Sequence, residues 1–92
     1  MNSFRIECSQ ATEQYVIQAL NGKEIKHVVK QISYLNDYGE EIMESDIDND
    51  SGDPALMVAG VIIEIDCDAD EADLDIALQE VASAEGINME IV

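Results

Sequence analysis

The chain has 92 residues and a formal net charge of −17, with 21 acidic residues, four Lys and Arg residues and one His. This length predicts one domain, and a hydrophobic fraction of 47% is too high for a disordered acidic tail. The charge argues against nucleic acid as a direct ligand and against an anionic membrane surface, because both would repel the chain.

The positive charges are confined to the first third of the chain. Arg5, Lys23, Lys26 and Lys30 are the only Lys and Arg residues, and 18 acidic residues follow the last of them. Residues 37–92 therefore carry a formal charge of −18. A folded domain cannot neutralise so many carboxylates with so few cations, so we expect them to face water, a metal ion or a basic partner.

The N-terminal half is predicted to form a strand, a helix and a second strand. Apolar residues alternate over 4–8, which indicates a strand with one buried face, and Ser9 is a suitable cap for a helix that ends at Gly22. The apolar positions of that helix are Ala11, Tyr15, Ala19 and Leu20. Residues 25–35 fit a helix or a strand, and their Val, Ile and Tyr content and the turn at 36–39 favour the strand.

The C-terminal half is predicted to contain a loop, a strand, a helix and a closing strand. Residues 44–54 hold five acids, which indicates an exposed, mobile loop, and the apolar run 56–65 indicates a central strand. Asp68 and the acid three residues later are expected to open a helix that ends at Gly86. Alternation over 87–91 indicates the last strand.

The order β-α-β-β-α-β resembles the ferredoxin-like arrangement, in which a four-stranded antiparallel sheet carries both helices on one face. The resemblance is one of topology and covers the whole chain. If residues 25–35 formed a helix, the order would become β-α-α-β-α-β. We therefore predict one α+β domain over residues 1–92, with the acidic loop at about 44–54. Its open sheet face would carry Glu7, Glu64 and Glu90 on three adjacent strands.

Cys8 and Cys67 are the only cysteines. The N-terminus lacks the apolar segment of a secretion signal, and no apolar run reaches the length of a membrane span. We therefore expect a cytoplasmic protein with both thiols reduced. In the ferredoxin-like arrangement the two cysteines end oppositely directed strands, at opposite edges of the sheet, which is too far apart for a disulfide.

No catalytic constellation accompanies the acidic residues. His27 is the only histidine and has no nucleophile beside it, and glycine-rich phosphate loops are absent. RNA-binding versions of the ferredoxin-like fold carry aromatic side chains on the two central strands. The corresponding strands here carry Arg5, Glu7, Ile62 and Glu64. We therefore expect a protein that is not an enzyme and uses no cofactor.

One acidic segment partly matches a calcium-binding loop. Asp46, Asp48 and Asp50 occupy the first three ligand positions of an EF-hand, but the glycine comes one residue late and the twelfth position is Met57. We expect a solvated loop without a metal. The alternative is a divalent-metal module in which Asp53 joins these three aspartates as a ligand.

Carboxylates are concentrated where the predicted central strand meets the following helix. Glu64, Asp66 and Asp68 alternate along the strand end, so they would project from one face at a repeat of about 6.6 Å. Rows of carboxylates at this spacing can imitate the phosphates of a nucleic-acid strand. We predict that this junction and the acidic loop together form one partner-binding surface. Its residues are Glu44, Asp46, Asp48, Asp50, Asp53, Glu64, Asp66, Asp68, Asp70, Glu71, Asp73 and Asp75.

In size, charge and lack of catalytic residues, the chain is similar to the small acidic inhibitors encoded by phages and mobile elements. These include DNA mimics that block restriction, CRISPR or DNA-repair enzymes. The resemblance implies that an acidic face occupies the basic nucleic-acid channel of a partner protein in the host cytoplasm. The alternatives are an immunity protein against a basic nuclease toxin, the metal module, and a homodimer formed through Val58, Ile62 and Val92.

Overall fold

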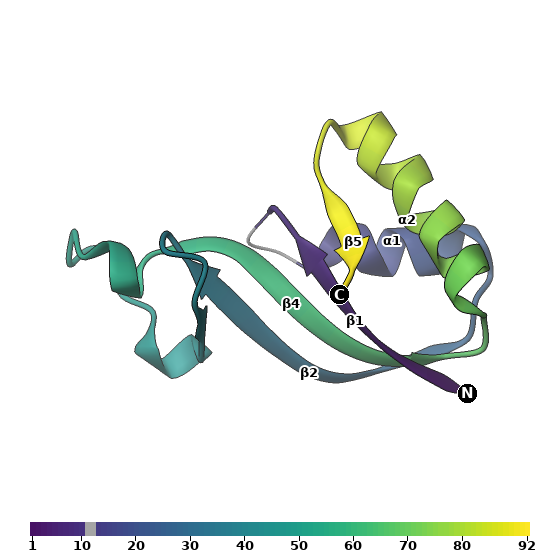
Figure 1. The fold of residues 1–92 in the computed structure, drawn as a ribbon, viewed down its shortest axis with the longest axis horizontal. Helices are drawn as coiled ribbons and strands as arrows, with labels where there is room; N and C mark the ends of the chain where they lie inside the picture. Colours follow the sequence, from purple (N-terminus) through teal and green to yellow (C-terminus); the bar gives the residue numbers. More distant parts are fainter. Residues whose placement is uncertain (11–12) are drawn as a thin grey trace.

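The computed structural model describes residues 1–10 and 13–92, which form two helices and one curled five-stranded sheet (Figure 1). The elements in chain order are β1 (Asn2–Cys8), α1 (Gln14–Gly22), β2 (His27–Asn36), β3 (Glu41–Ile42), β4 (Val58–Cys67), α2 (Glu71–Glu85) and β5 (Met89–Ile91). Two short 3₁₀ turns, η1 (Glu44–Asp46) and η2 (Pro54–Leu56), precede β4. The strands pair antiparallel in the order β3-β2-β4-β1-β5.

The α+β class is confirmed, but the prediction of four strands is wrong. The additional strand is β3, which pairs with β2 only through Tyr34↔Ile42 and Leu35↔Glu41. Two residues are too few to produce a recognisable alternation, so the sequence indicated the turn without the strand after it. The ambiguous segment 25–35 is a strand, as predicted, because it forms most of β2.

The hydrophobic core lies between the helices and one face of the sheet. Alternate residues of β1 and β4 supply the sheet side of the core, because successive side chains of a strand point to opposite faces. These residues are Ile6, Cys8, Val61, Ile63, Ile65 and Cys67, and the helices add Val16, Ala19, Leu20, Leu74, Ala77, Leu78 and Ala82. Glu7 and Glu64, which alternate with them, are therefore left on the helix-free face.

The predicted start of α1 is wrong. The helix begins at Gln14, and Glu13 before it provides no side-chain cap. Ser9 instead joins β1 to the end of the chain, because its Oγ accepts the Asn88 N–H at 3.1 Å and its own N–H donates to the Asn88 carbonyl oxygen at 2.9 Å. Ala11 lies outside the described residues, and Ala19 is buried as predicted.

The cap of α2 is Asp70, two residues later than predicted. Its carboxylate accepts the backbone N–H of Asp73 at 2.8 Å, which satisfies one of the free donors of the first turn. The N–H of Asp68 donates to the Lys26 carbonyl oxygen at 2.9 Å, so Asp68 still belongs to the sheet side of the junction. The predicted end at Gly86 is confirmed, with a left-handed φ of 68°.

Both cysteines are buried free thiols, as predicted. They lie on neighbouring central strands, where the register aligns Cys8 with Val61 and Asn2 with Cys67. Six residues of paired strand, about 20 Å, therefore separate them. The thiols are kept apart by lying at opposite ends of one strand pair, not at opposite edges of the sheet.

We expect both thiols to react with a thiol reagent in denaturant without prior reduction, and to react slowly in the folded protein. Burial raises the pKa of Cys8 and of Cys67, which lowers the thiolate fraction in addition to blocking access. The measurement is a timed colorimetric thiol titration in buffer and in guanidinium chloride. Fewer than two thiols in the unreduced, unfolded chain would contradict the separation of the two residues.

Gly60 of β4 lies close to the backbone carbonyl of Cys8 at the end of β1. A Cβ atom on Gly60 would lie 2.9 Å from the Cys8 carbonyl oxygen, which requires a backbone shift. We expect Gly60→Ala to lower the free energy of unfolding by about 1–3 kcal/mol in urea denaturation. Gly22→Ala is the matched control, because the added Cβ would meet no atom within 4 Å beyond its chain neighbours and its own helix backbone. Equal stability of the two variants would show that the close approach is not a constraint.

Candidate protein-binding surface

The twelve predicted partner-binding carboxylates form two groups at opposite ends of β4 (Figure 1). The loop cluster, which precedes β4, consists of Glu44, Asp46, Asp48, Asp50 and Asp53. The junction cluster consists of Glu64, Asp66, Asp68, Asp70, Glu71, Asp73 and Asp75. A ten-residue strand is about 30 Å long, and the longest extent of the molecule is 40 Å. The structure therefore does not bring the two groups together into one continuous surface.

Three members of the junction cluster are engaged within the chain. Glu64 Oε1 lies 3.2 Å from Arg5 Nε, and Asp66 accepts a hydrogen bond from Ser3 Oγ and lies 3.4 Å from Lys30 Nζ. The hydrogen bond from Ser3, followed by the contact with Lys30, holds the pKa of Asp66 below its ordinary value. The third engaged member is Asp70, which caps α2. Of the predicted row Glu64, Asp66 and Asp68, only Asp68 is therefore left without a side-chain partner among the described residues.

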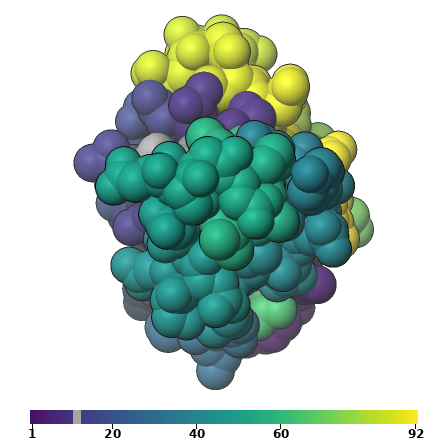
Figure 2. All heavy atoms as spheres, turned by 90° about the vertical axis from the view of Figure 1, so that its left-hand side faces the viewer, coloured from purple at the N-terminus to yellow at the C-terminus, as the bar shows by residue number. Residues whose placement is uncertain are grey.

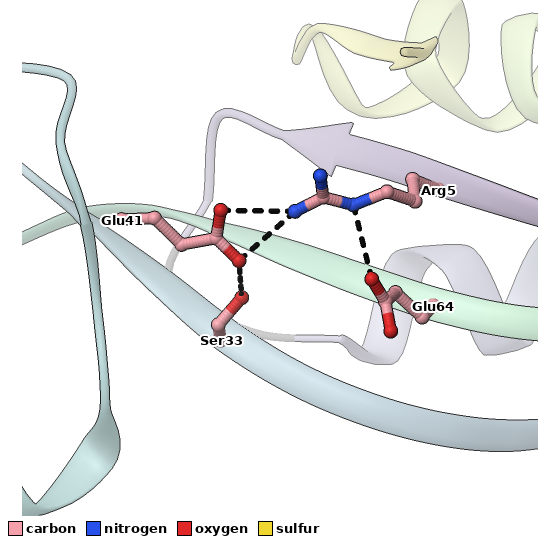
Figure 3. Close-up of polar contacts among 4 residues, drawn as sticks. All are labelled: Arg5, Ser33, Glu41 and Glu64. Atoms are coloured by element: carbon pink, nitrogen blue, oxygen red, sulfur yellow. Dashed lines mark hydrogen bonds and ion pairs between the residues drawn. The ribbon is translucent and has the colours of Figure 1, made fainter.

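Arg5 forms the most extensive polar contact on the helix-free face of the sheet (Figure 3). Its Nη2 donates to both carboxylate oxygens of Glu41 at 2.9 Å, and Ser33 Oγ donates to Glu41 Oε1 at 2.6 Å. The Ser33 hydrogen bond and the Arg5 guanidinium hold the pKa of Glu41 below its ordinary value. Arg5 Nε is buried and makes an ion-pair contact with Glu64 without hydrogen-bond geometry.

The remaining carboxylates of this face lie beside one another on β1 and β5. Glu7 is directly opposite Glu90, as the predicted sheet face requires, whereas Glu64 is opposite Arg5. The three residues of the predicted dimer face are unequally accessible. Ile62 is only 7% exposed and Val92 is 57% exposed, so Ile62 has little apolar surface to offer a second copy.

The loop cluster belongs to an acidic segment with almost no compensating positive charge. Residues 37–57 contain eight acidic residues and no Lys or Arg, and Glu41 is the only one of the eight that forms an ion pair within the described ranges. Figure 2 views the molecule from this end, where the loop forms the surface nearest the viewer. The Asp48 and Asp53 carboxylates accept the N–H groups of Asp50 and Ala55. Glu44, Asp46 and Asp50 are left as exposed carboxylates that make no hydrogen bond or ion pair with the described residues.

Within the described residues, no group of three or more His, Cys, Asp or Glu side chains is arranged to hold a metal ion. The four aspartates of the metal alternative lie in this loop. Two of them are used to fix its turns, because Asp48 accepts the Asp50 N–H at 3.1 Å and Asp53 accepts the Ala55 N–H at 3.0 Å. The structure therefore does not bring Asp46, Asp48, Asp50 and Asp53 together as a ligand set.

Comparisons with protein-family models, curated proteins and solved structures gave no match to this chain. Neither α1 nor α2 is long and apolar enough to cross a membrane, and the described ranges contain no other helix of that kind. Function is therefore inferred from the charge and geometry of the chain.

The melting temperature is expected to rise with NaCl, because salt shortens the Debye length from about 30 Å at 0.01 M to about 3 Å at 1 M and screens the self-repulsion of the chain. It should also rise at first as the pH falls from 7, because protonation reduces the net negative charge. A salt-independent melting temperature would contradict the crowding of like charges.

The acid limb of the same profile is expected to have the opposite sign. The pKa values of Glu41 and Asp66 are lowered in the folded state, so their stabilisation is present above the unfolded pKa of about 4 and is lost as the pH falls through the folded values. Circular-dichroism melts between pH 7 and pH 2 measure both limbs. The double variant Glu41→Gln, Asp66→Asn should flatten only the acid limb.

Proposed function

We propose that this chain is a non-catalytic inhibitor that binds a basic, nucleic-acid-binding protein and excludes the nucleic acid from that protein. The observation that carries this proposal is the excess of unpaired carboxylate. Of the 18 acidic residues after Lys30, only Glu41, Glu64, Asp66 and Glu80 form ion pairs within the described part of the chain. Lys and Arg side chains of a partner can supply the missing positive charge.

The dimensions of the molecule support mimicry of a nucleic acid. Its longest extent of 40 Å corresponds to roughly 12 nucleotide steps of about 3.4 Å along a strand of DNA. Acidic clusters lie towards both ends of that length. A protein of this length with acidic ends can lie along a basic channel and so prevent a phosphate backbone from entering it.

We also propose that the fold is ferredoxin-like with one short strand added at an edge. The four longest strands lie in the order β2-β4-β1-β5, and α1 and α2 pack on one face. Setting β3 aside leaves the β-α-β-β-α-β order of that arrangement. Because this arrangement supports many unrelated functions, it adds nothing to the choice of partner.

The loop cluster is the better candidate for the first contact with the partner. All four Lys and Arg side chains of the chain lie elsewhere, and the contact of Arg5 with residues 37–57 is to Glu41, outside the cluster. In the junction cluster, by contrast, Glu64 already pairs with Arg5 and Asp66 with Lys30. Uncompensated carboxylates attract a basic surface without first giving up an existing ion pair.

Two charge-reversal variants test the proposed surface. The loop variant is Glu44→Lys, Asp46→Lys, Asp50→Lys, and the junction variant is Asp68→Lys, Glu71→Lys, Asp75→Lys. All six side chains are exposed and make no side-chain hydrogen bond or ion pair with the described residues, so we expect both variants to fold. The two variants change the net charge equally at opposite ends of the molecule, so each is the matched control for the other.

The partner is obtained by low-salt capture from bacterial lysate, and fluorescence anisotropy then measures competition with the nucleic acid of that partner. We expect the wild-type chain to displace the nucleic acid, with an affinity that falls as salt rises. The loop variant should lose at least about 30-fold in affinity, because one desolvated carboxylate is worth about 2 kcal/mol or more. Unchanged competition by both variants would refute an acidic contact surface, and a larger loss in the junction variant would move the contact to that end.

A further inference from the structure

Residues 37–57 are attached to the molecule without a hydrophobic core of their own. None of these side chains is buried. The segment adds only two residue pairs to the sheet, through β3. Asn36, the last residue of β2, attaches both ends of the segment to that strand, because its side chain accepts the N–H groups of Tyr38 and Glu40 and donates to the Ala55 carbonyl oxygen. These contacts all attach the segment to β2 and none of them reaches β4 or β1.

Arg5 reaches this segment across two intervening strands on the helix-free face of the sheet. In the order β3-β2-β4-β1-β5, β2 and β4 lie between Glu41 on β3 and Arg5 on β1. Three strand spacings of about 4.8 Å correspond to roughly 14 Å in a flat sheet, so the two side chains meet above the intervening strands (Figure 3). Both intervening strands take part in this contact. Ser33 of β2 donates to Glu41, and Glu64 of β4 forms an ion pair with Arg5.

The other ion pairs of the described chain do not involve this segment. Lys30 and Asp66 belong to the adjacent strands β2 and β4, and Lys23 at the end of α1 pairs with Glu80 of α2. The Arg5–Glu41 pair is thus the only ion pair of the described residues that connects 37–57 to the rest of the molecule. Among the described residues, no other side-chain hydrogen bond or ion pair joins this segment to β1.

We propose that Arg5 is a positioning residue that holds residues 37–57, and with them the loop cluster, in one orientation relative to the sheet. Without its contact to Glu41, the segment keeps the β2–β3 pairing, the Ser33–Glu41 hydrogen bond and the Asn36 bonds, all of which attach it to β2, and it can swing relative to β4 and β1. Exposed ion pairs contribute little to global stability, so the effect is local motion and not unfolding. Its consequence for partner binding rests on the proposed function, whereas the orientation itself does not.

Electron-electron distance measurements between two spin labels test this role. The labels are placed through Asp50→Cys in the loop and Glu85→Cys at the end of α2, both of which are exposed positions. The native thiols Cys8 and Cys67 are buried and label slowly. We compare Arg5→Gln with Lys30→Gln, which removes the same charge from the same sheet face but has its partner, Asp66, outside the segment.

We expect one narrow distance distribution in the labelled parent and in Lys30→Gln, and a distribution at least about twofold broader in Arg5→Gln. Arg5→Lys, which retains the charge but lacks the guanidinium fork, should fall between them. Glu41→Gln should reproduce the broadening, and it decides the question if Arg5→Gln does not fold.

Unchanged widths in Arg5→Gln and Glu41→Gln would overturn the proposal. Equal broadening in Lys30→Gln would also overturn it, because the loss of any nearby cation would then suffice. No partner is present in this measurement, so failure of the proposed inhibitor function would leave these distances unaffected. The two proposals therefore fail independently.

Discussion

The pairing of β1 with β4 determines both the core of the protein and the charge of its helix-free face. All seven residues of β1 pair with β4, from Asn2↔Cys67 to Cys8↔Val61. This register places Ile6 and Ile63 beneath the helices and sets Arg5 beside Glu64 on the other face. A shift of one residue would exchange the two faces and bury charged side chains without compensation, so the register is strongly specified.

The same register explains why a chain with four Lys and Arg residues has an uneven charge distribution. Arg5 and Lys30 both lie over the sheet and contact Glu41, Glu64 and Asp66. The two cations therefore compensate the middle of the molecule, while the acidic residues beyond the ends of β4 are left to the solvent or to a partner. The net charge alone therefore hides how the charge is distributed. The carboxylates that a partner could contact are concentrated at the two ends of the molecule, beyond the ends of β4.

The apolar run identified β4 and helical spacing identified α2, whereas β2 was assigned from its Val, Ile and Tyr content and the turn after it, because its spacing also fits a helix. Periodicity could not identify β3, which has two residues, and Asp68 was selected over Asp70 because neighbouring acids are equivalent as caps in sequence. The contact of Arg5 with Glu41 depends on the order of strands in the sheet, which no local pattern contains. The separation of the two acidic clusters, in contrast, follows from the length of β4, which the apolar run already indicated.

The outer edge of β2 shows how a single lysine can affect behaviour in concentrated solution. Residues 27–33 have no strand beside them on that edge in the described chain, and Val28 and Val29 are 53% and 38% exposed. Lys30 is the extra residue of a bulge between Val29 and Gln31, and a bulge with a lysine discourages the addition of another strand. Neutralising Lys30 by acetylation would therefore weaken the protection of this edge against fibrillar self-association while leaving the core intact.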